Sequence, residues 1–276
     1  MEYRDVGIVG VGLIGGSIAL AALEKGYSVR LYEPVEKLDR FKGAVAVRDL
    51  RSLVEQSEVV ILATPSSALA GMASSLATLV RPEQIVSDVA SLKMPVVELL
   101  SPILGQRCHY VPSHPMAGSE KSGSESARGD LFAGAATIVC PEFAREESAV
   151  EQIAKFWEKL GTRVLFASAE DHDEWVGAVS HFPHLLAALL VHHIAQSSPE
   201  IFKVAGTGFK DMTRVASGSP KLWIDILLAN RETVGKHLQQ FRHDLENALE
   251  ILEAEDRKRL QALLDDAKED RDRLQS

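Results

Sequence analysis

The 276-residue sequence predicts an α/β protein in two parts. We expect a doubly wound, Rossmann-type parallel sheet over residues 1–168, followed by an all-α helical domain over residues 169–276. Three observations lead to this prediction. A glycine-rich turn lies between a strand pattern and a helix pattern near the N-terminus. Short β-branched runs then alternate with amphipathic segments up to Phe166, and from Glu170 onward the apolar spacing is helical.

The first strand–turn–helix unit is Val6–Leu20, with glycines at Gly10, Gly12 and Gly15. In such a unit the first glycine permits a sharp turn, the second lets the backbone approach a pyrophosphate, and the third lets the helix pack on the strand. The N–H groups at the start of the helix then receive the phosphates. The pattern predicts a dinucleotide site, and a glycine-rich turn without a ligand is the alternative.

The predicted cofactor is NAD, with NADP less favoured. The next strand, Ser28–Tyr32, is followed by Glu33, whose carboxylate can accept hydrogen bonds from ribose hydroxyls and would repel a 2′-phosphate. The candidate cofactor-binding residues are Gly10, Gly12, Leu13, Ile14, Gly15, Glu33, Thr64 and Pro65.

The later strands and helices of the first domain follow from the same alternation. Strands are expected at Val59–Ala63, Ile85–Asp88, Tyr110–Ser113, Ala136–Val139 and Arg163–Phe166, and helices at Ala68–Leu79 and Glu146–Leu160. Gly161 is a suitable residue to end the last helix. Ligands of parallel sheets bind outside the carboxyl ends of the strands. We therefore expect the glycine turn, Thr64-Pro65, Ser91 and His114 to line one crevice, and the polar stretch Gly118–Gly134 to be a functional loop.

The second domain reads as helices joined by short turns. The expected helices are His172–Val179, Pro183–Gln196, Glu200–Thr207, Pro220–Glu253 and Asp256–Leu274, the last with a solvated, charged face. An apolar seam at steps of three and four residues comprises Val234, Leu238, Phe241, Leu245, Leu249 and Leu252. A small helical domain buries such a seam with difficulty by itself. The seam predicts a homodimer through the helical domain, with an internal hairpin as the alternative.

Composition indicates which classes of partner and which cellular compartment to expect. A net charge of −9 without a clustered basic stretch argues against nucleic acid. Two cysteines, Cys108 and Cys140, give neither a disulfide framework nor metal-ligand spacing, so we expect a cytoplasmic protein. The chain enters its first strand without a charged leader, and apolar runs such as Leu185–Val191 are short for a bilayer, so we expect no secretory signal and no membrane partner.

Three segments carry the residues that chemistry would use. His114, held between a strand end and Pro115, is placed to act as a general base near neutral pH. The helical part contributes His172-Asp173 with Ser180–His184, and then Gly208–Arg214 with Trp223 nearby. The motifs are SHPMAGSEKSG, DVASLK, the HD…SHFPH pair and GFKDMTR…W. Together, and in this order along nearly the whole chain, they resemble the prephenate/arogenate dehydrogenases (cyclohexadienyl dehydrogenases) of tyrosine biosynthesis.

The resemblance implies an NAD(P)-dependent oxidative decarboxylation of prephenate and/or arogenate, a small-molecule substrate, between a dinucleotide-binding domain and a helical dimerisation domain. It also implies roles for particular residues. His114 would be the base, Ser91 its partner in orienting the ring hydroxyl, and Arg214 the holder of a substrate carboxylate. His184, Glu120, Ser119, Trp223 and Asp211 would line the substrate site, and Asp173 would orient such groups. A carboxylate at Glu120 would favour the ammonium group of arogenate, although Lys121 could neutralise it.

Each assignment has a structural alternative. His114 could be a satisfied structural histidine, Ser91 a helix N-cap, and Arg214 only an ion-pair partner of Asp211. A metal site from His172, His181 and His184 is conceivable, but the reaction does not need one, and we expect none. The rival functions are another two-domain NAD(P)-dependent hydroxyacid or imine dehydrogenase, and a non-catalytic dinucleotide-sensing protein. The regulatory ACT domain and the fused chorismate mutase of longer family members are not expected.

Overall fold

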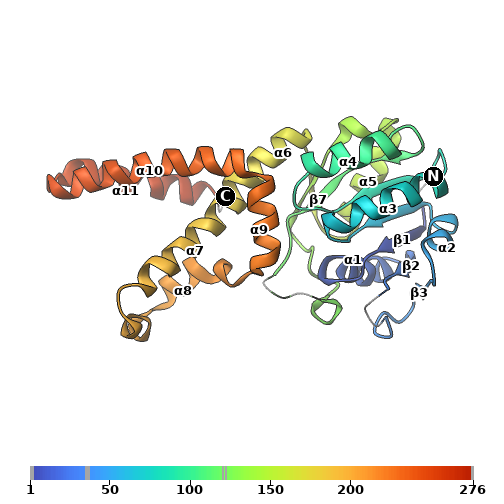
Figure 1. Ribbon diagram of the computed structural model, residues 1–276, viewed down its shortest axis with the longest axis horizontal. Helices are drawn as coiled ribbons and strands as arrows, with labels where there is room; N and C mark the ends of the chain where they lie inside the picture. The colour runs from blue at the N-terminus through green and yellow to red at the C-terminus, as the bar shows by residue number, and fades with distance from the viewer. Residues whose placement is uncertain (1–2, 35–37, 120, 122, 275–276) are drawn as a thin grey trace. The chain divides into compact units, whose positions relative to one another are not determined.

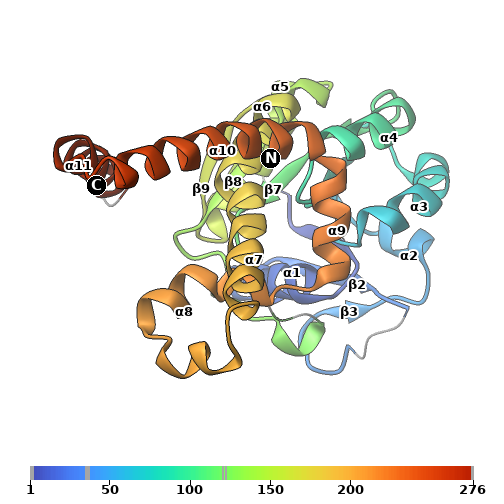
Figure 2. The same ribbon diagram turned by 60° about the vertical axis from the view of Figure 1, so that its left-hand side comes forward.

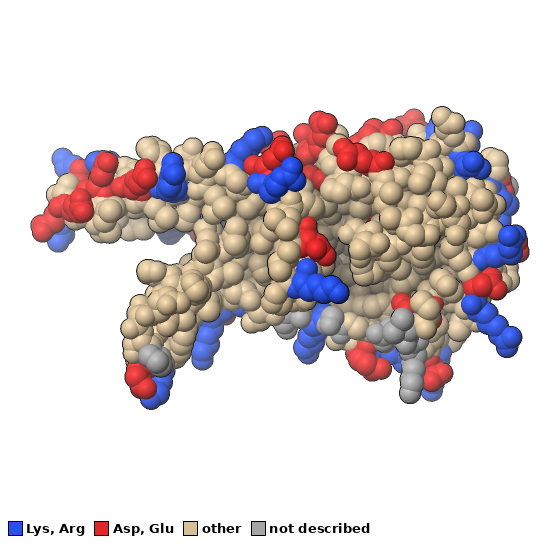
Figure 3. Space-filling view, viewed as in Figure 1, with Lys and Arg blue, Asp and Glu red and all other residues tan. Residues whose placement is uncertain are grey.

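The computed structural model describes residues 3–34, 38–119, 121 and 123–274, which form two compact units, Met1–Asn230 and Arg231–Ser276. The first unit contains the parallel sheet and the helices that follow it, and the second is a pair of helices (Figure 1). On the face drawn in Figure 3, acidic and basic side chains are interspersed rather than gathered by sign.

The main sheet has six parallel strands in the order β3-β2-β1-β4-β5-β6. The strands are β1 (Asp5–Val9), β2 (Ser28–Tyr32), β3 (Val45–Ala46), β4 (Val59–Leu62), β5 (Ile85–Asp88) and β6 (His109–Tyr110), and the helices between them are α1 (Leu13–Glu24), α2 (Leu50–Glu55), α3 (Ser66–Leu79) and α4 (Met94–Leu104). This strand order is that of a doubly wound dinucleotide-binding sheet, with its switch point between β1 and β4. The predicted fold class is confirmed.

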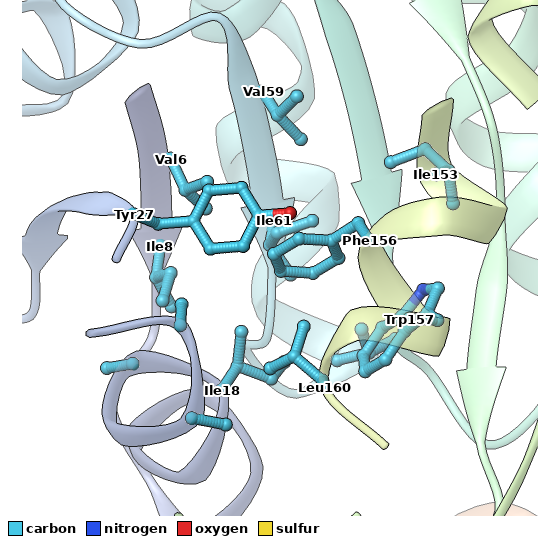
Figure 4. Packing of buried hydrophobic residues seen from close by; sticks show 14 of the residues in the cluster. Val6, Ile8, Ile18, Tyr27, Val59, Ile61, Ile153, Phe156, Trp157 and Leu160 are labelled. Atoms are coloured by element: carbon cyan, nitrogen blue, oxygen red, sulfur yellow. The ribbon is translucent and has the colours of Figure 1, made fainter. Parts of the chain in front are cut away.

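Alternate side chains of the central strands enter two cores, one on each face of the sheet. Val59 and Ile61 of β4 belong to the core that also contains Trp157, whereas Val60 and Leu62 belong to the other. Figure 4 shows the first core, where α1 and α5 (Glu147–Lys159) pack over β1 and β4. A strand buried on both faces needs apolar residues at every position, which is why β4 reads as a continuous apolar run.

Three strands lie outside the main sheet, contrary to the prediction that they complete it. Strands β7 (Ser113–Pro115), β8 (Ala136–Val139) and β9 (Arg163–Phe166) form a separate sheet in which β7 is antiparallel to β8 and β8 is parallel to β9. The Val111 N–H still donates to the Val86 carbonyl beside β6, at 2.9 Å, whereas the Pro112 carbonyl accepts from the Cys140 N–H that follows β8, also at 2.9 Å. The chain leaves the main sheet there, and His114 lies inside β7 rather than after a parallel strand.

Much of the stretch Gly118–Gly134 packs against the first helix. The short 3₁₀ turn Ser124–Ser126 is followed by Arg128, whose N–H donates to Ser17 Oγ of α1, and by Phe132, which is fully buried against Trp157. The second half of this stretch is therefore held in place by burial of apolar side chains such as Phe132, which the sequence did not indicate because the stretch has no apolar periodicity.

The helices expected before and after Pro183 form one helical run. It consists of α6 (Ala169–Val176), a π-helical turn (Gly177–His181) and α7 (Phe182–Ala195). A proline cannot make the regular i→i−4 hydrogen bond, and a π turn absorbs that loss without ending the helix. By length and composition alone this 27-residue run is apolar enough to cross a membrane, which the short run Leu185–Val191 did not suggest.

The helices that follow α7 in the first unit are short. They are the 3₁₀ helix Pro199–Val204, α8 (Thr207–Thr213), the 3₁₀ turn Arg214–Ser217 and α9 (Pro220–Ala229) (Figure 2). The predicted single helix from Pro220 to Glu253 is interrupted at Asn230. This buried side chain donates a hydrogen bond to the Asp173 carbonyl at 2.7 Å and contacts His181 Nδ1 at 3.1 Å.

The second unit is a hairpin of α10 (Arg231–Glu253) and α11 (Arg257–Arg273), with Asp256 accepting hydrogen bonds at the start of α11. The hairpin alternative is therefore realised, but it leaves part of the apolar seam uncovered. Leu245, Leu249 and Leu252 are 56, 57 and 60% exposed in the single chain.

Candidate active site

The glycine turn after β1 has the geometry that a dinucleotide loop requires. Gly10 has a φ of +87°, and its N–H donates to the Tyr32 carbonyl at 3.0 Å. A Cβ on Gly15 would lie 1.9 Å from the Gly10 carbonyl oxygen, so α1 approaches the turn as closely as a glycine allows. A Cβ on Gly12 would meet nothing within 4 Å. The turn therefore presents open space at the start of α1, whose first residues are Leu13 and Ile14.

Three further predicted cofactor residues, Glu33, Thr64 and Pro65, lie at the same edge of the sheet. Glu33 follows β2, and its Oε2 accepts a hydrogen bond from the Val11 N–H at 3.0 Å, which holds the carboxylate beside the glycine turn. Thr64, followed by Pro65 at the start of α3, packs against Gly10. Its buried Oγ1 has no hydrogen-bond partner among the described residues. An open backbone turn, an adjacent acid and an unsatisfied hydroxyl fit a dinucleotide.

A hydrogen bond joins His114 to His172 on α6, the first helix of the helical part, and a second one continues from His172 to its neighbour Asp173. Its Nδ1 lies 2.8 Å from His172 Nε2, and His172 Nδ1 lies 2.7 Å from Asp173 Oδ1. Burial, followed by the nearby His172 and Lys93, lowers the pKa of His114 well below its usual value. His114 is therefore neutral at pH 7, the state that a general base requires.

A buried ion pair between Lys93 and Asp88 lies next to this series of hydrogen bonds. Lys93 Nζ donates to Asp88 Oδ1 at 2.5 Å and to the Ser113 carbonyl at 2.6 Å, and the Tyr110 hydroxyl donates to Asp88 Oδ2 at 2.8 Å. The Lys93 and Asp88 side chains are fully buried. The sequence prediction did not assign a role to either residue. The motif DVASLK could have indicated this ion pair, because it places the charged residues Asp88 and Lys93 at the end of an apolar strand.

Ser91 lies in the turn between β5 and α4 and is partly buried. The N-cap of α4 is Lys93, so the N-cap alternative for Ser91 is wrong. The structure records no hydrogen bond between the described residues Ser91 and His114, and the role of Ser91 as partner of His114 remains a prediction.

The substrate residues predicted on α7 and α9 lie in contact. The rings of His184 and Trp223 stack with centroids 3.4 Å apart and an interplanar angle of 13°. Gly218 passes beside this pair, where a Cβ would come within 2.5 Å of Trp223 Nε1. His181 instead contacts Asn230, and burial lowers its pKa to about 4. Within the described part of the chain no group of three or more His, Cys, Asp or Glu residues could hold a metal ion.

Three of the other predicted substrate residues, Ser119, Asp211 and Arg214, are exposed. Asp211 lies on α8 and Arg214 begins the 3₁₀ turn that follows, and both elements pack against α7. Ser119 is exposed and accepts a hydrogen bond from the Lys121 N–H at 3.2 Å. Glu120 falls outside the described residues. The structure thus joins His114 to the helical part, whereas the substrate roles of these four residues remain predictions.

A doubly wound sheet with an open glycine turn, together with a neutral histidine near its carboxyl edge, defines a dinucleotide-dependent oxidoreductase. Comparison with known proteins shows which family within this class the chain belongs to. Residues 28–166 match the family model described as prephenate dehydrogenase, nucleotide-binding domain, and residues 168–266 match prephenate dehydrogenase, dimerization domain.

Curated relatives match most of the chain. The chain is 34% identical to a prephenate dehydrogenase of Bacillus subtilis (97% of this chain, 75% of that protein) and 32% identical to a cyclohexadienyl dehydrogenase of Zymomonas mobilis (92% and 90%). A crystal structure of prephenate dehydrogenase from A. aeolicus in complex with hydroxyphenyl propionate and NAD⁺ superposes with a TM-score of 0.89, at 31% identity and 99% coverage of both chains. The chain belongs to the prephenate dehydrogenase family.

Proposed function

We propose that this protein catalyses the NAD-dependent oxidative decarboxylation of prephenate and/or arogenate, giving 4-hydroxyphenylpyruvate and/or tyrosine together with CO₂. The ring carbon that bears the hydroxyl loses a hydride and the hydroxyl loses its proton, which gives a dienone. Loss of the carboxylate as CO₂ then makes the ring aromatic, and the phenolate oxygen that forms takes the proton back. Membership of the prephenate dehydrogenase family supports the reaction. The single observation that carries it is the neutral, partly buried His114, hydrogen-bonded into the helical part of the chain.

NAD, when bound, accepts the hydride. The open backbone at Gly12 and the N–H groups at the start of α1 suit the pyrophosphate, and the carboxylate of Glu33 suits the ribose hydroxyls. A Glu33→Ser variant is expected to bind NADP more tightly relative to NAD, because it removes the charge that repels a 2′-phosphate. Unchanged discrimination between the two cofactors would contradict this role.

In this proposal His114 takes the proton of the ring hydroxyl, and Ser91 helps to orient that hydroxyl. Arg214 binds a substrate carboxylate through its planar guanidinium, with Asp211 beside it, while the stacked His184 and Trp223 form a wall of the pocket. A neutral imidazole suits this step because a base protonated at pH 7 could not accept the proton.

The functional unit that we propose is a homodimer that works in the cytoplasm. The match to a dimerization-domain model, the exposed leucines of α10 and the exposed Val179 and Leu189 of the long helical run support subunit pairing. Both cysteines are buried and free, which suits a reducing compartment. The domain boundary that we propose for this arrangement lies at residues 168/169.

Formation of reduced nicotinamide, followed by absorbance after adding prephenate or arogenate to protein and NAD, tests the function. His114→Ala is expected to lower turnover by about 10²- to 10⁴-fold with unchanged NAD affinity, the usual contribution of a general base. Arg214→Ala should mainly raise KM. The exposed His243 provides a matched control, and His243→Ala should behave as wild type. Absence of reduction with both substrates would leave the rival hydroxyacid or imine dehydrogenase, or a dinucleotide-sensing protein.

The choice between the two substrates is assigned to Glu120. Its carboxylate would attract the ammonium of arogenate and disfavour the ketone of prephenate. Glu120→Gln is therefore expected to lower kcat/KM for arogenate relative to prephenate, measured side by side. An unchanged ratio would remove Glu120 from this role.

A further inference from the structure

A continuous hydrogen-bonded chain runs from His114 on β7 through His172 to Asp173, both on α6. His172 is completely buried, and Asp173 is 8% exposed. The Asp173 carboxylate also accepts the backbone N–H of Lys93 through Oδ1 at 2.7 Å and that of Met94 through Oδ2 at 2.9 Å, at the start of α4. Three donors from two segments therefore hold one carboxylate in place.

The direction of each hydrogen bond in the chain follows from Asp173. An ionised carboxylate only accepts, so the proton between Asp173 and His172 sits on His172 Nδ1. Burial lowers the pKa of His172, which keeps the ring neutral with a single ring proton. His172 Nε2 is then an acceptor, and the 2.8 Å contact requires the proton to sit on His114 Nδ1.

We propose that His172 is a positioning residue that holds His114 in the tautomer with a proton on Nδ1 and a free lone pair on Nε2, and that Asp173 fixes His172 in turn. The inference rests on the proposed function, because it assigns the nitrogen that accepts the substrate proton. Without a partner that can only accept, an imidazole also populates the tautomer protonated on Nε2, which presents a donor to the substrate hydroxyl and cannot act as its base.

The charges around the chain favour the same arrangement. Lys93 is paired with Asp88 next to the two rings, and its positive charge opposes protonation of both histidines. The carboxylates of Asp173 and Asp88 raise the pKa of His172, but burial together with Lys93 outweighs them and the pKa stays lowered. His181, the other histidine that faces the chain, is itself kept neutral by burial. When His114 gains a proton on Nε2, its Nδ1–H remains bonded to His172, through which the negative charge of Asp173 stabilises the imidazolium.

Ring ¹⁵N chemical shifts of histidine-labelled protein, without substrate, test the tautomer directly. The His114 signals, assigned by their loss in His114→Asn, are expected to show a proton on Nδ1 and none on Nε2 at pH 7.5. In His172→Phe, which keeps a ring but offers no acceptor, the Nε2 proton should appear. A wild-type His114 protonated on Nε2, or a shift pattern unchanged by His172→Phe, would overturn the proposal.

Kinetics of matched substitutions separate positioning from packing. The amide of glutamine reaches the place of a histidine Nε2 and can accept from His114, whereas that of asparagine reaches only the place of Nδ1. His172→Gln is expected to stay within about tenfold of wild-type kcat, while His172→Asn and His172→Phe should lose about 10²-fold, which is at the lower end of the range expected for removal of the base itself. KM for the substrate should change by less than about threefold in all three variants, because none removes a substrate contact.

The control is His109→Gln. His109 is a buried histidine that begins β6 and takes no part in the hydrogen bonds between His114, His172 and Asp173, so the kcat of this variant should equal that of wild type. Unfolding temperature and NAD affinity are measured for every variant. Equal losses in the glutamine and phenylalanine variants, with normal folding, would indicate packing and overturn the proposal. If the wild type oxidises neither prephenate nor arogenate, the proposed function fails, while the ¹⁵N measurement still decides this inference.

Discussion

Gly15→Ala tests whether the close approach of α1 to the glycine turn is required. The added Cβ would lie 1.9 Å from the Gly10 carbonyl oxygen and 3.0 Å from the Ala63 Cβ. The oxygen belongs to the backbone, so relief requires the helix and the turn to separate by more than about 1 Å, a displacement of the kind that accompanies overpacking. Gly15 is itself helical, so its own φ and ψ suit alanine and the effect comes from the contact alone.

The expected cost is about 1–3 kcal/mol of folding free energy, the usual range for overpacking. For a chain of this length that lowers Tm by about 2–4 °C per kcal/mol. Displacing the start of α1 from the phosphates should also weaken NAD binding by at least about tenfold, or about 1.4 kcal/mol. Thermal unfolding followed by circular dichroism and NAD titration by calorimetry measure the two effects.

Two other glycines provide matched controls. Gly71→Ala, in the middle of α3 with nothing within 4 Å of its Cβ, should be neutral or stabilise by about 0.5–1 kcal/mol and leave NAD affinity unchanged. Gly12→Ala also meets no protein atom, so it should preserve Tm yet weaken NAD binding, because its Cβ occupies the space proposed for the pyrophosphate. A Gly15→Ala protein with wild-type Tm and wild-type NAD affinity would refute the reasoning.

Three further predictions concern stability and assembly. Burial lowers the pKa of His181 to about 4, so His181 takes up a proton in the unfolded protein before it does in the folded one as pH falls. The free energy of unfolding should therefore drop by up to about 3 kcal/mol between pH 6.5 and 4, measured by urea titration. A free energy of unfolding that does not change over this pH range would contradict the prediction. Lys93→Met leaves the Asp88 carboxylate buried without its cation and should destabilise the protein by about 3–5 kcal/mol in the same assay, whereas a loss below 1 kcal/mol would show that Asp88 is satisfied by other groups. Leu249→Glu should convert the proposed dimer to monomer in light scattering, while Val45→Glu, at an equally exposed position on β3, should not; a dimeric Leu249→Glu protein would remove α10 from the interface.

The elements that were predicted correctly depend on contacts close in sequence. The glycine turn, the apolar strand Val59–Leu62 and helix α5 each follow from spacing over fewer than twenty residues. A positive φ at Gly10 and a helix end at Gly161 are local consequences of residue type. The doubly wound fold class followed from the alternation of such local strand and helix patterns along the chain.

The errors occur where distant segments compete for one partner. Strands β7, β8 and β9 have ordinary strand patterns, and nothing local reveals that they pair with one another in a second sheet. The break at Asn230 is equally invisible, because its cause is a pair of hydrogen bonds to groups 57 and 49 residues away. A local pattern reports the tendency of a segment, whereas the final arrangement depends on which long-range contacts it can satisfy.

The sequence by itself determined that this chain folds around a dinucleotide-type glycine turn and carries the prephenate dehydrogenase motifs, because backbone conformation at glycines and the period of apolar residues are local properties. Only the tertiary structure decided what His114 touches. Its partner His172 lies 58 residues along the chain, and the carboxylate that orients both rings is held by backbone N–H groups of a third segment. The direction of each hydrogen bond in a buried series of side chains depends on all of its members, because a group donates only where the folded structure places an acceptor beside it.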